Sequence, residues 1–225
     1  MRGDGRGCTL GEALVIVKVC GVRTPEIAEA AIDAGADWLG LMFVAASPRW
    51  VDDAAALALT RAVRGRADLV GVFIEPTVAT CDEAASRYRL AAVQIHGRID
   101  PAMTARSSVP VIPVINVESH AAVCTIDLPP DPLVMLDGLP GKGRLPGGTG
   151  HRVPLEWAAD VARHRRVLLA GGLGAGNVGA AVAAVHPEGV DASSHLERSP
   201  GDKDPDLVRA FVRAARSAAA LERVA

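Results

Sequence analysis

Short apolar segments rich in valine, isoleucine and leucine recur along the whole chain. Most of them are continuous rather than alternating, which is typical of parallel strands covered by helices. We predict eight strands from these segments. They cover residues 13–20, 38–44, 69–75, 91–97, 109–117, 132–138, 167–173 and 189–195.

Segments with helix signals separate these strands. Thr24 is a candidate N-cap, Pro25 takes the first helical position and Gly35 follows the last turn. Comparable signals predict helices over residues 51–65, 77–89 and 204–217. The segment 118–130 gives the weakest helix signal, because it is short and ends in prolines.

Eight strand–helix units in 225 residues predict an α/β protein, a single-domain (β/α)8 or TIM barrel. An open doubly wound sheet is the alternative, but it would need a glycine-rich phosphate fingerprint after its first strand. The chain has "CGVRTP" there, which does not fit. We expect a loose leader over 1–12, the barrel over 13–218 and a short tail over 219–225.

The composition narrows the class of protein. Lysine and arginine number 24 against 26 acidic residues, so the charge gives no indication of a nucleic-acid partner. Apolar runs are interrupted before about 18 residues, and the first dozen residues lack the apolar core of a secretory signal. The four cysteines show no paired spacing. We therefore expect a cytoplasmic protein with free thiols and no membrane partner.

Polar residues gather at the carboxyl ends of the predicted strands, where the active sites of barrels lie. A lone cysteine is usually a buried apolar residue, and an aspartate before glycine is usually a turn residue. Convergence of several polar groups on one mouth goes beyond what packing requires. The residues concerned include Cys20, Arg49, Gln94, His96 and Asp137.

Three loops rich in glycine or serine follow the last three strands. Glycine lets backbone amides approach an anion closely, and barrels often bind phosphate after strands seven and eight. We therefore expect a phosphorylated small-molecule ligand, with tight turns alone as the alternative. The candidate phosphate-binding residues are Gly147, Gly148, Gly171, Gly172, Ser193 and Ser194.

Six blocks in a fixed order carry a resemblance to a known family. They are "VKVCGVRTPEIAEAAIDAGADWLGLMFVAASPRWV", "VGVFIEP", "AAVQIHG", "LDG…PGGTG", "LLAGGLGAGNV" and "GVDASSHLERSPGDKDPDLVRAFV". Together they span about residues 15 to 217 and are similar to the phosphoribosylanthranilate isomerases of tryptophan biosynthesis. The resemblance implies an Amadori rearrangement of N-(5'-phosphoribosyl)anthranilate to 1-(2-carboxyphenylamino)-1-deoxyribulose 5-phosphate. It also implies a barrel fold and no metal or organic cofactor, and it leaves monomer and homodimer open.

The resemblance also implies roles for the residues at the mouth. Cys20 would be the general base, and Asp137 the general acid. Arg49 would meet the anthranilate end of the substrate, because its planar fork suits a carboxylate. Gln94 and His96 are expected to line the site and position substrate.

A free thiol titrates at about pH 8.5, which is high for a base at neutral pH. Side chains alternate along a strand, so Lys18 and Cys20 should point to the same face. We therefore expect the Lys18 ammonium to contact this part of the substrate site and to help hold Cys20 as a thiolate.

Four positions depart from the family's pattern. His195 follows the serine pair where glycine is usual, His151 follows "GGTG", Glu75 ends the third strand and Pro113 lies in the fifth. These changes bear on substrate affinity more than on the type of reaction. They leave three alternatives: the related isomerase of histidine biosynthesis, an isomerase of another amino-sugar phosphate, and a non-catalytic phosphate-binding relative. The first typically has an aspartate where this chain has Cys20.

Overall fold

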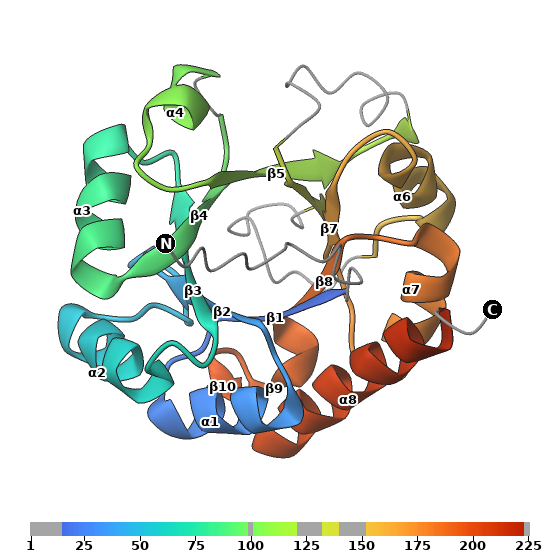
Figure 1. Cartoon of the computed structure of the whole chain (residues 1–225), viewed down its shortest axis with the longest axis horizontal. Helices are drawn as coiled ribbons and strands as arrows, with labels where there is room; N and C mark the ends of the chain where they lie inside the picture. Colours follow the sequence, from blue (N-terminus) through green and yellow to red (C-terminus); the bar gives the residue numbers. More distant parts are fainter. Residues whose placement is uncertain (1–14, 99–100, 121–131, 140–151, 223–225) are drawn as a thin grey trace, which may run out of the picture.

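The computed structural model describes residues 15–98, 101–120, 132–139 and 152–222. Eight parallel strands follow one another around a closed barrel, and the last strand pairs with the first (Figure 1). The (β/α)8 barrel predicted from the sequence is therefore confirmed. The strands are β1 (Ile16–Cys20), β2 (Trp38–Met42), β3 (Asp68–Ile74), β4 (Leu90–His96), β5 (Val111–Val117), β6 (Val134–Gly138), β7 (Val167–Leu169) and β8 (Gly189–Ala192).

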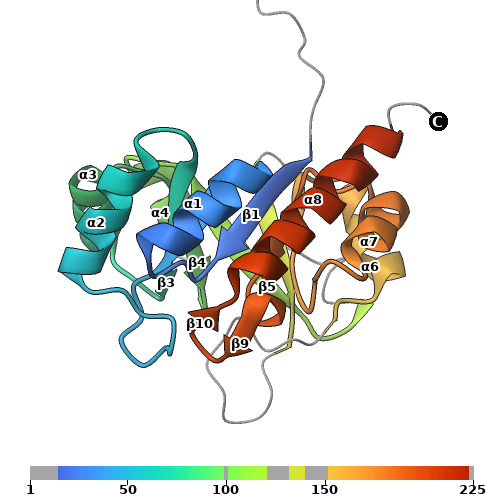
Figure 2. The ribbon, with the colours of Figure 1, turned by 90° about the horizontal axis from the view of Figure 1, so that it is seen from below.

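Helices surround the barrel on the outside (Figures 1 and 2). The first begins as predicted, since the Thr24 hydroxyl accepts a hydrogen bond from the Ile27 amide and Gly35 ends the helix in the left-handed conformation. None of the described helices is both long and apolar enough to cross a membrane. The helices are α1 (Pro25–Ala34), α2 (Asp53–Val63), α3 (Val78–Tyr88), α4 (Pro101–Arg106), α6 (Leu155–Ala162), α7 (Val178–Val185) and α8 (Pro205–Glu222).

Several boundaries differ from those expected. The chain leaves β7 and β8 earlier than predicted, and β8 leads into a short 3₁₀ helix, η1 (Ser194–Leu196). A small hairpin of β9 (Glu197–Ser199) and β10 (Asp202–Lys203) then precedes α8. Figure 2 shows this hairpin close to the start of α8.

Helix α8 continues to Glu222, although a tail was expected from residue 219. Alanine, leucine and glutamate favour helix, and Ala219 is buried, so the last turns are retained. The expected leader over 1–12 lies outside the described residues, as do residues 121–130 of the segment with the weakest helix signal.

The barrel interior is apolar over part of its depth and polar at one end. Alternate residues of β3 to β7, and their immediate flanks, form a separate apolar cluster inside the strands. On β4 and β6 the next inward positions carry buried polar side chains instead, Gln94 and Asp137. The change from apolar to polar marks the catalytic end expected of a barrel. The interior cluster comprises Val70, Ala92, Ile112, Val114, Leu133, Met135, Leu168 and Ala170.

Candidate active site

Buried polar and charged side chains collect around the carboxyl ends of the strands. Charged groups are almost never fully buried unless they are paired or serve a function. None of the described residues forms a cluster of three or more histidine, cysteine and acidic side chains suited to a metal ion. The buried polar residues are Lys18, Arg49, Gln94, His96, Asp137, Asp191 and Lys203.

Lys18 and Cys20 lie next to each other on the inner face of β1, as alternation predicted. A β-carbon built on Gly40 of β2 would lie 2.9 Å from Cys20 Sγ and 3.2 Å from Lys18 Nζ. Gly40 therefore leaves the space that both side chains occupy. Lys18 Nζ also donates a hydrogen bond of 2.8 Å to Oδ1 of Asp191 on β8.

The groups around Cys20 shift its pKa in opposite directions. Burial alone would lower the pKa of Lys18, but Asp191 and Cys20 raise it above its ordinary value, so the ammonium persists. Burial raises the pKa of the Cys20 thiol, and Asp191 adds to this rise. Lys18, Lys203 and Arg49 lower the same pKa without overcoming burial. Cys20 is therefore a thiol at neutral pH, whereas Lys18 was expected to help hold it as a thiolate.

Replacing Lys18 with methionine is expected to raise the pKa of the Cys20 thiol further, because the nearest cation is lost. The pH dependence of thiolate ultraviolet absorbance, with Cys20→Ser subtracted as background, measures this pKa. The double variant Lys18→Met/Asp191→Asn separates the lost cation from the carboxylate left unpaired. An unchanged thiol midpoint in Lys18→Met would remove the idea that Lys18 tunes Cys20.

Asp137 lies on β6, across the mouth from β1. Its Oδ1 atom accepts a hydrogen bond of 2.8 Å from the Gly138 amide. Burial, followed by the nearby Asp191 carboxylate, raises the pKa of Asp137 to about 7. A substantial fraction of the side chain therefore carries a proton at neutral pH, as a general acid requires.

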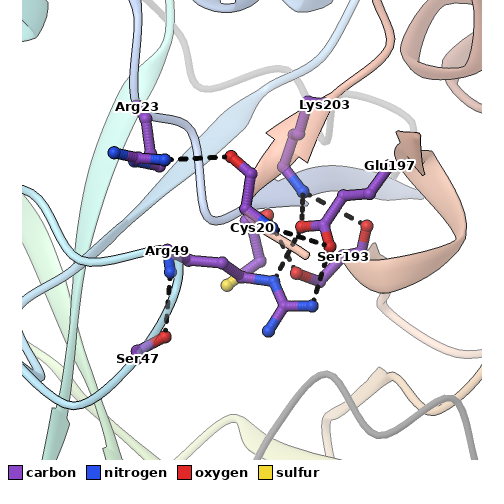
Figure 3. A network of polar contacts seen from close by, with 8 residues as sticks. Cys20, Arg23, Ser47, Arg49, Ser193, Glu197 and Lys203 are labelled. Atoms are coloured by element: carbon purple, nitrogen blue, oxygen red, sulfur yellow. Dashed lines mark hydrogen bonds and ion pairs between the residues drawn. The ribbon is translucent and has the colours of Figure 1, made fainter. Parts of the chain in front are cut away.

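Arg49 follows β2, and Glu197 holds it from the hairpin side (Figure 3). Nε of Arg49 lies 2.7 Å from Oε1 of Glu197, and Nη2 lies 2.8 Å from Oε2. The backbone at Gly21 has a φ of +76°, and a β-carbon there would lie 2.7 Å from Cδ of Arg49. The family resemblance implied that the planar fork of Arg49 meets a ligand carboxylate. Glu197 occupies the Nε and Nη2 edge of that fork, so only the outer end of the guanidinium remains for a ligand.

Glu197 also connects Arg49 to β1, through Lys203 and Ser193 (Figure 3). Lys203 Nζ donates to Glu197 Oε1 at 3.0 Å and to the Ser193 carbonyl at 3.2 Å. The Ser193 hydroxyl in turn donates to the Cys20 carbonyl at 3.1 Å. Burial raises the pKa of Glu197, but the contacts with Arg49 and Lys203 lower it below its usual range. The hairpin, β1 and the loop after β2 are thus connected by one network of ion pairs and hydrogen bonds.

Gln94 and His96 are both buried on β4, where they were expected to line the site. Nε2 of Gln94 lies 3.1 Å from Nε2 of His96. Burial and then the positive charge of Lys18 lower the pKa of His96 to about 4. The imidazole is therefore neutral at physiological pH.

The loop after β7 has a backbone suited to binding an anion. Gly171 and Gly172 have φ values of +88° and +65°, which glycine adopts at little cost. The Asn177 side chain accepts from the Gly174 amide and donates to the Gly172 carbonyl, both at 2.8 Å. These bonds hold the loop at the start of α7, where a helix N-terminus favours negative charge.

The remaining phosphate candidates fall into two groups. Ser193 and Ser194 are partly buried where β8 leads into η1, on the same side of the barrel as the loop after β7. Gly147 and Gly148 lie outside the described residues, as does His151.

The structure also describes the surroundings of three other positions that depart from the family's pattern. His195 is exposed beside the loop after β7, since a β-carbon on Gly174 would lie 3.4 Å from its Cβ. Glu75 has a φ of +44°, and its carboxylate accepts a hydrogen bond of 3.1 Å from the Arg98 amide. Pro113 is buried within β5. Glu75 and Pro113 therefore serve the scaffold, whereas His195 borders the candidate anion site.

Three charged residues of the site were missed in the sequence. Asp191 was within reach of sequence reasoning, because it lies two positions before Ser193 at the end of a predicted strand. Glu197 and Lys203 belong to a hairpin outside the strand–helix pattern, and no periodic signal marks them.

Comparison with known proteins identifies the family of this chain. Residues 17–214 match the family described as N-(5'phosphoribosyl)anthranilate (PRA) isomerase. A protein of that name from Azorhizobium caulinodans is 39% identical over 214 residues, covering 92% of this chain and 94% of the relative.

Two solved structures are similar over most of their length. Monomers generated from a dimeric Thermotoga maritima phosphoribosylanthranilate isomerase share 27% identity with a TM-score of 0.75. A phosphoribosylanthranilate isomerase in complex with reduced 1-(o-carboxyphenylamino)-1-deoxyribulose 5-phosphate shares 26% identity with a TM-score of 0.77. Each comparison covers 90% of this chain and 99% of the other. The chain therefore belongs to the N-(5'-phosphoribosyl)anthranilate isomerase family.

Proposed function

We propose that Cys20 and Asp137 catalyse the reaction for which the family is named, as general base and general acid. The product would be 1-(2-carboxyphenylamino)-1-deoxyribulose 5-phosphate, on the route to tryptophan. One observation carries the assignment: a thiol and a carboxyl of raised pKa, both buried, lie on β1 and β6 across one mouth. Two groups on opposite sides of a sugar suffice for this isomerisation.

The acid acts first. The Asp137 carboxyl donates its proton to the ring oxygen of the phosphoribosyl group, and the bond between that oxygen and C1' breaks. The nitrogen lone pair forms the C=N bond of an iminium ion. Burial supports this role, because it keeps the Asp137 carboxyl protonated at a pH where an exposed aspartate is fully ionised.

The base acts on the opened sugar. The Cys20 thiolate takes the proton from C2', and the C–H electron pair forms a C1'=C2' bond while the iminium nitrogen becomes neutral. The resulting enolamine gains a proton at C1' and loses one from its C2' hydroxyl, which gives the ketone. Lys18 and Lys203 support this role, because their charges favour the thiolate.

Substrate binding is proposed to use both sides of the mouth. The outer end of the Arg49 guanidinium binds the anthranilate carboxylate, and Gln94 and His96 contact the sugar. Gly171, Gly172 and Ser193 bind the phosphate through backbone amides, and Ser194 adds its hydroxyl, since the Ser193 hydroxyl donates to the Cys20 carbonyl. Gly147 and Gly148 are proposed as further phosphate contacts on sequence grounds alone.

Replacing Glu197 with glutamine is expected to raise KM roughly tenfold with little change in kcat. Arg49 loses the charged partner that orients it, while the reacting groups stay in place. Steady-state kinetics measure both constants. Glu29→Gln is the matched control, because it removes the charge from an exposed ion pair with Arg66. A fall in kcat at unchanged KM would contradict a role for Glu197 in positioning Arg49.

The pH profile follows from the order of the two pKa values. Cys20 holds its proton more tightly than Asp137, so the reactive form with thiolate and carboxylic acid is a minority state. Its population rises with pH up to about 7, then stays level until the thiol itself titrates, and falls above that point. We therefore expect kcat/KM to decline below about pH 7 and to be level just above it. A decline that begins near pH 7 as the pH rises would contradict this order.

Turnover tests the proposed function directly. Phosphoribosylanthranilate is generated in situ, and the loss of its fluorescence is followed with the purified wild-type protein. Rapid loss supports the isomerase. Binding of the reduced product analogue without turnover would instead indicate a non-catalytic relative, and absence of both would point to a different sugar phosphate.

We also propose a cellular compartment and the possible oligomeric states. We propose a cytoplasmic protein, since Cys20 and Cys81 are free thiols. Either a monomer or a homodimer is compatible with the proposed chemistry, because the described residues named for it come from one barrel.

A further inference from the structure

Three buried polar atoms in the described part of the chain have no hydrogen-bond partner. They are Oε1 of Gln94, Nδ1 of His96 and Oδ1 of Asn116. Gln94 and His96 are each only 2% exposed. A buried polar atom without a partner is unfavourable, so native proteins seldom keep three together unless a ligand completes their hydrogen bonds.

The three side chains share one sector of the mouth. Gln94 of β4 pairs in register with Ile112 of β5, which belongs to the apolar cluster inside the barrel. Asn116 lies four residues after Ile112, so alternation turns it inward as well. Its register partner on β6 is Asp137, the proposed acid. The unpartnered atoms therefore border the place where the sugar reacts.

The hydrogen-bond roles of these atoms follow from their contacts. The side-chain nitrogen of Gln94 only donates, so Nε2 of His96 accepts the 3.1 Å hydrogen bond between them. The His96 ring is neutral, and its one proton is therefore on Nδ1. The sector thus offers one N–H donor and two amide oxygen acceptors, all uncharged.

An uncharged set of one donor and two acceptors matches a hydroxyl group, which donates one hydrogen bond and accepts others. It does not match a phosphate or carboxylate, because the amide oxygens would face oxygens that carry negative charge. In the proposed reaction, C1', C2' and the oxygen on C4' all change, and C5' carries the phosphate. The C3' hydroxyl is the one sugar hydroxyl that takes no part in the chemistry.

We propose that Gln94, His96 and Asn116 form a hydroxyl subsite that binds the C3' hydroxyl of the sugar, with Asn116 as a specificity-determining residue. This inference rests on the proposed function. Holding the C3' hydroxyl fixes the sugar chain between the phosphate loops and Arg49. It also keeps C2' oriented toward Cys20 after the ring has opened, when the chain would otherwise rotate freely.

The test compares two ligands, the reduced product analogue and the same compound lacking the C3 hydroxyl. Calorimetric dissociation constants are measured for wild type and for Asn116→Ala. Wild type should bind the deoxy compound about tenfold more weakly, which corresponds to about 1.4 kcal/mol for one buried hydroxyl left out. In Asn116→Ala this discrimination should shrink to less than about threefold, since the two deletions remove the same interaction.

Ile115→Val is the matched control, because Ile115 is the neighbour of Asn116 on β5 that packs against the outer core. This variant should keep the full discrimination. Asn116→Ser, which retains a hydroxyl acceptor, guards against a misfolded alanine variant and should keep more discrimination than Asn116→Ala. Equal binding of both ligands by wild type, or undiminished discrimination in Asn116→Ala, would overturn the subsite alone. Failure of wild type to bind either ligand would overturn the proposed function with it.

Discussion

Replacing Cys20 with alanine is expected to lower kcat by about 10²–10⁴-fold, the usual contribution of a positioned general base. The variant removes the group that takes the C2' proton, and two buried basic side chains near it, Lys18 and His96, are not suited to replace it. Lys18 is bound to Asp191, and the His96 ring faces Gln94 and carries little basicity.

The loss in Cys20→Ala should appear in kcat far more than in KM, because Arg49 and the phosphate loops are untouched. The fluorescence assay measures both constants. Cys81→Ala is the matched control, since Cys81 is a buried free thiol on α3, away from the mouth. Undiminished turnover in Cys20→Ala would reverse the assignment and return Cys20 to the status of a buried apolar residue.

Replacing Asp137 with asparagine is expected to have an effect of the same order, about 10²–10⁴-fold in kcat. Asparagine keeps the shape and the contact with the Gly138 amide, but it has no acidic proton to give the ring oxygen. Ring opening should then become the slow step. The pH dependence that Asp137 imposes on the residual rate should disappear with the carboxyl.

The controls for Asp137→Asn separate chemistry from binding. Asp68→Asn makes the same change at an exposed position at the opposite end of the barrel strands, and it should leave kcat unchanged. Calorimetry with the reduced product analogue should show that Asp137→Asn still binds ligand. Turnover of Asp137→Asn at the wild-type rate would exclude Asp137 as the acid.

The barrel could be predicted from the sequence because its signals are local. Apolar runs mark the strands, and caps such as Thr24 and Gly35 mark helix ends. Alternation also placed Lys18 and Cys20 on one face, and the space at Gly40 confirms this. The strand ends were harder to place. Loops after β7 and β8 leave the barrel at Ala170 and Ser193 within runs that remain apolar or small.

The electrostatics of the site could not be read from the sequence. The proximity of Asp191 to Lys18 joins residues 173 positions apart and exists only because the last strand closes on the first. Glu197 binds the edge of the Arg49 guanidinium that was expected to meet the substrate carboxylate. The hairpin that carries Glu197 has no periodic signal in the sequence. Asn116 belongs to no motif, and its unpartnered oxygen beside the proposed acid follows only from the structure.

The most direct test of the account is a single-turnover measurement with substrate carrying deuterium at C2'. If Cys20 breaks the C2'–H bond during catalysis, wild type should convert the deuterated substrate more slowly than the substrate with ordinary hydrogen at C2'. Cys20→Ala should be slow with both under the same conditions. Rapid conversion of the two substrates by Cys20→Ala, at rates equal to those of wild type, would contradict the central claim that this thiol is the base.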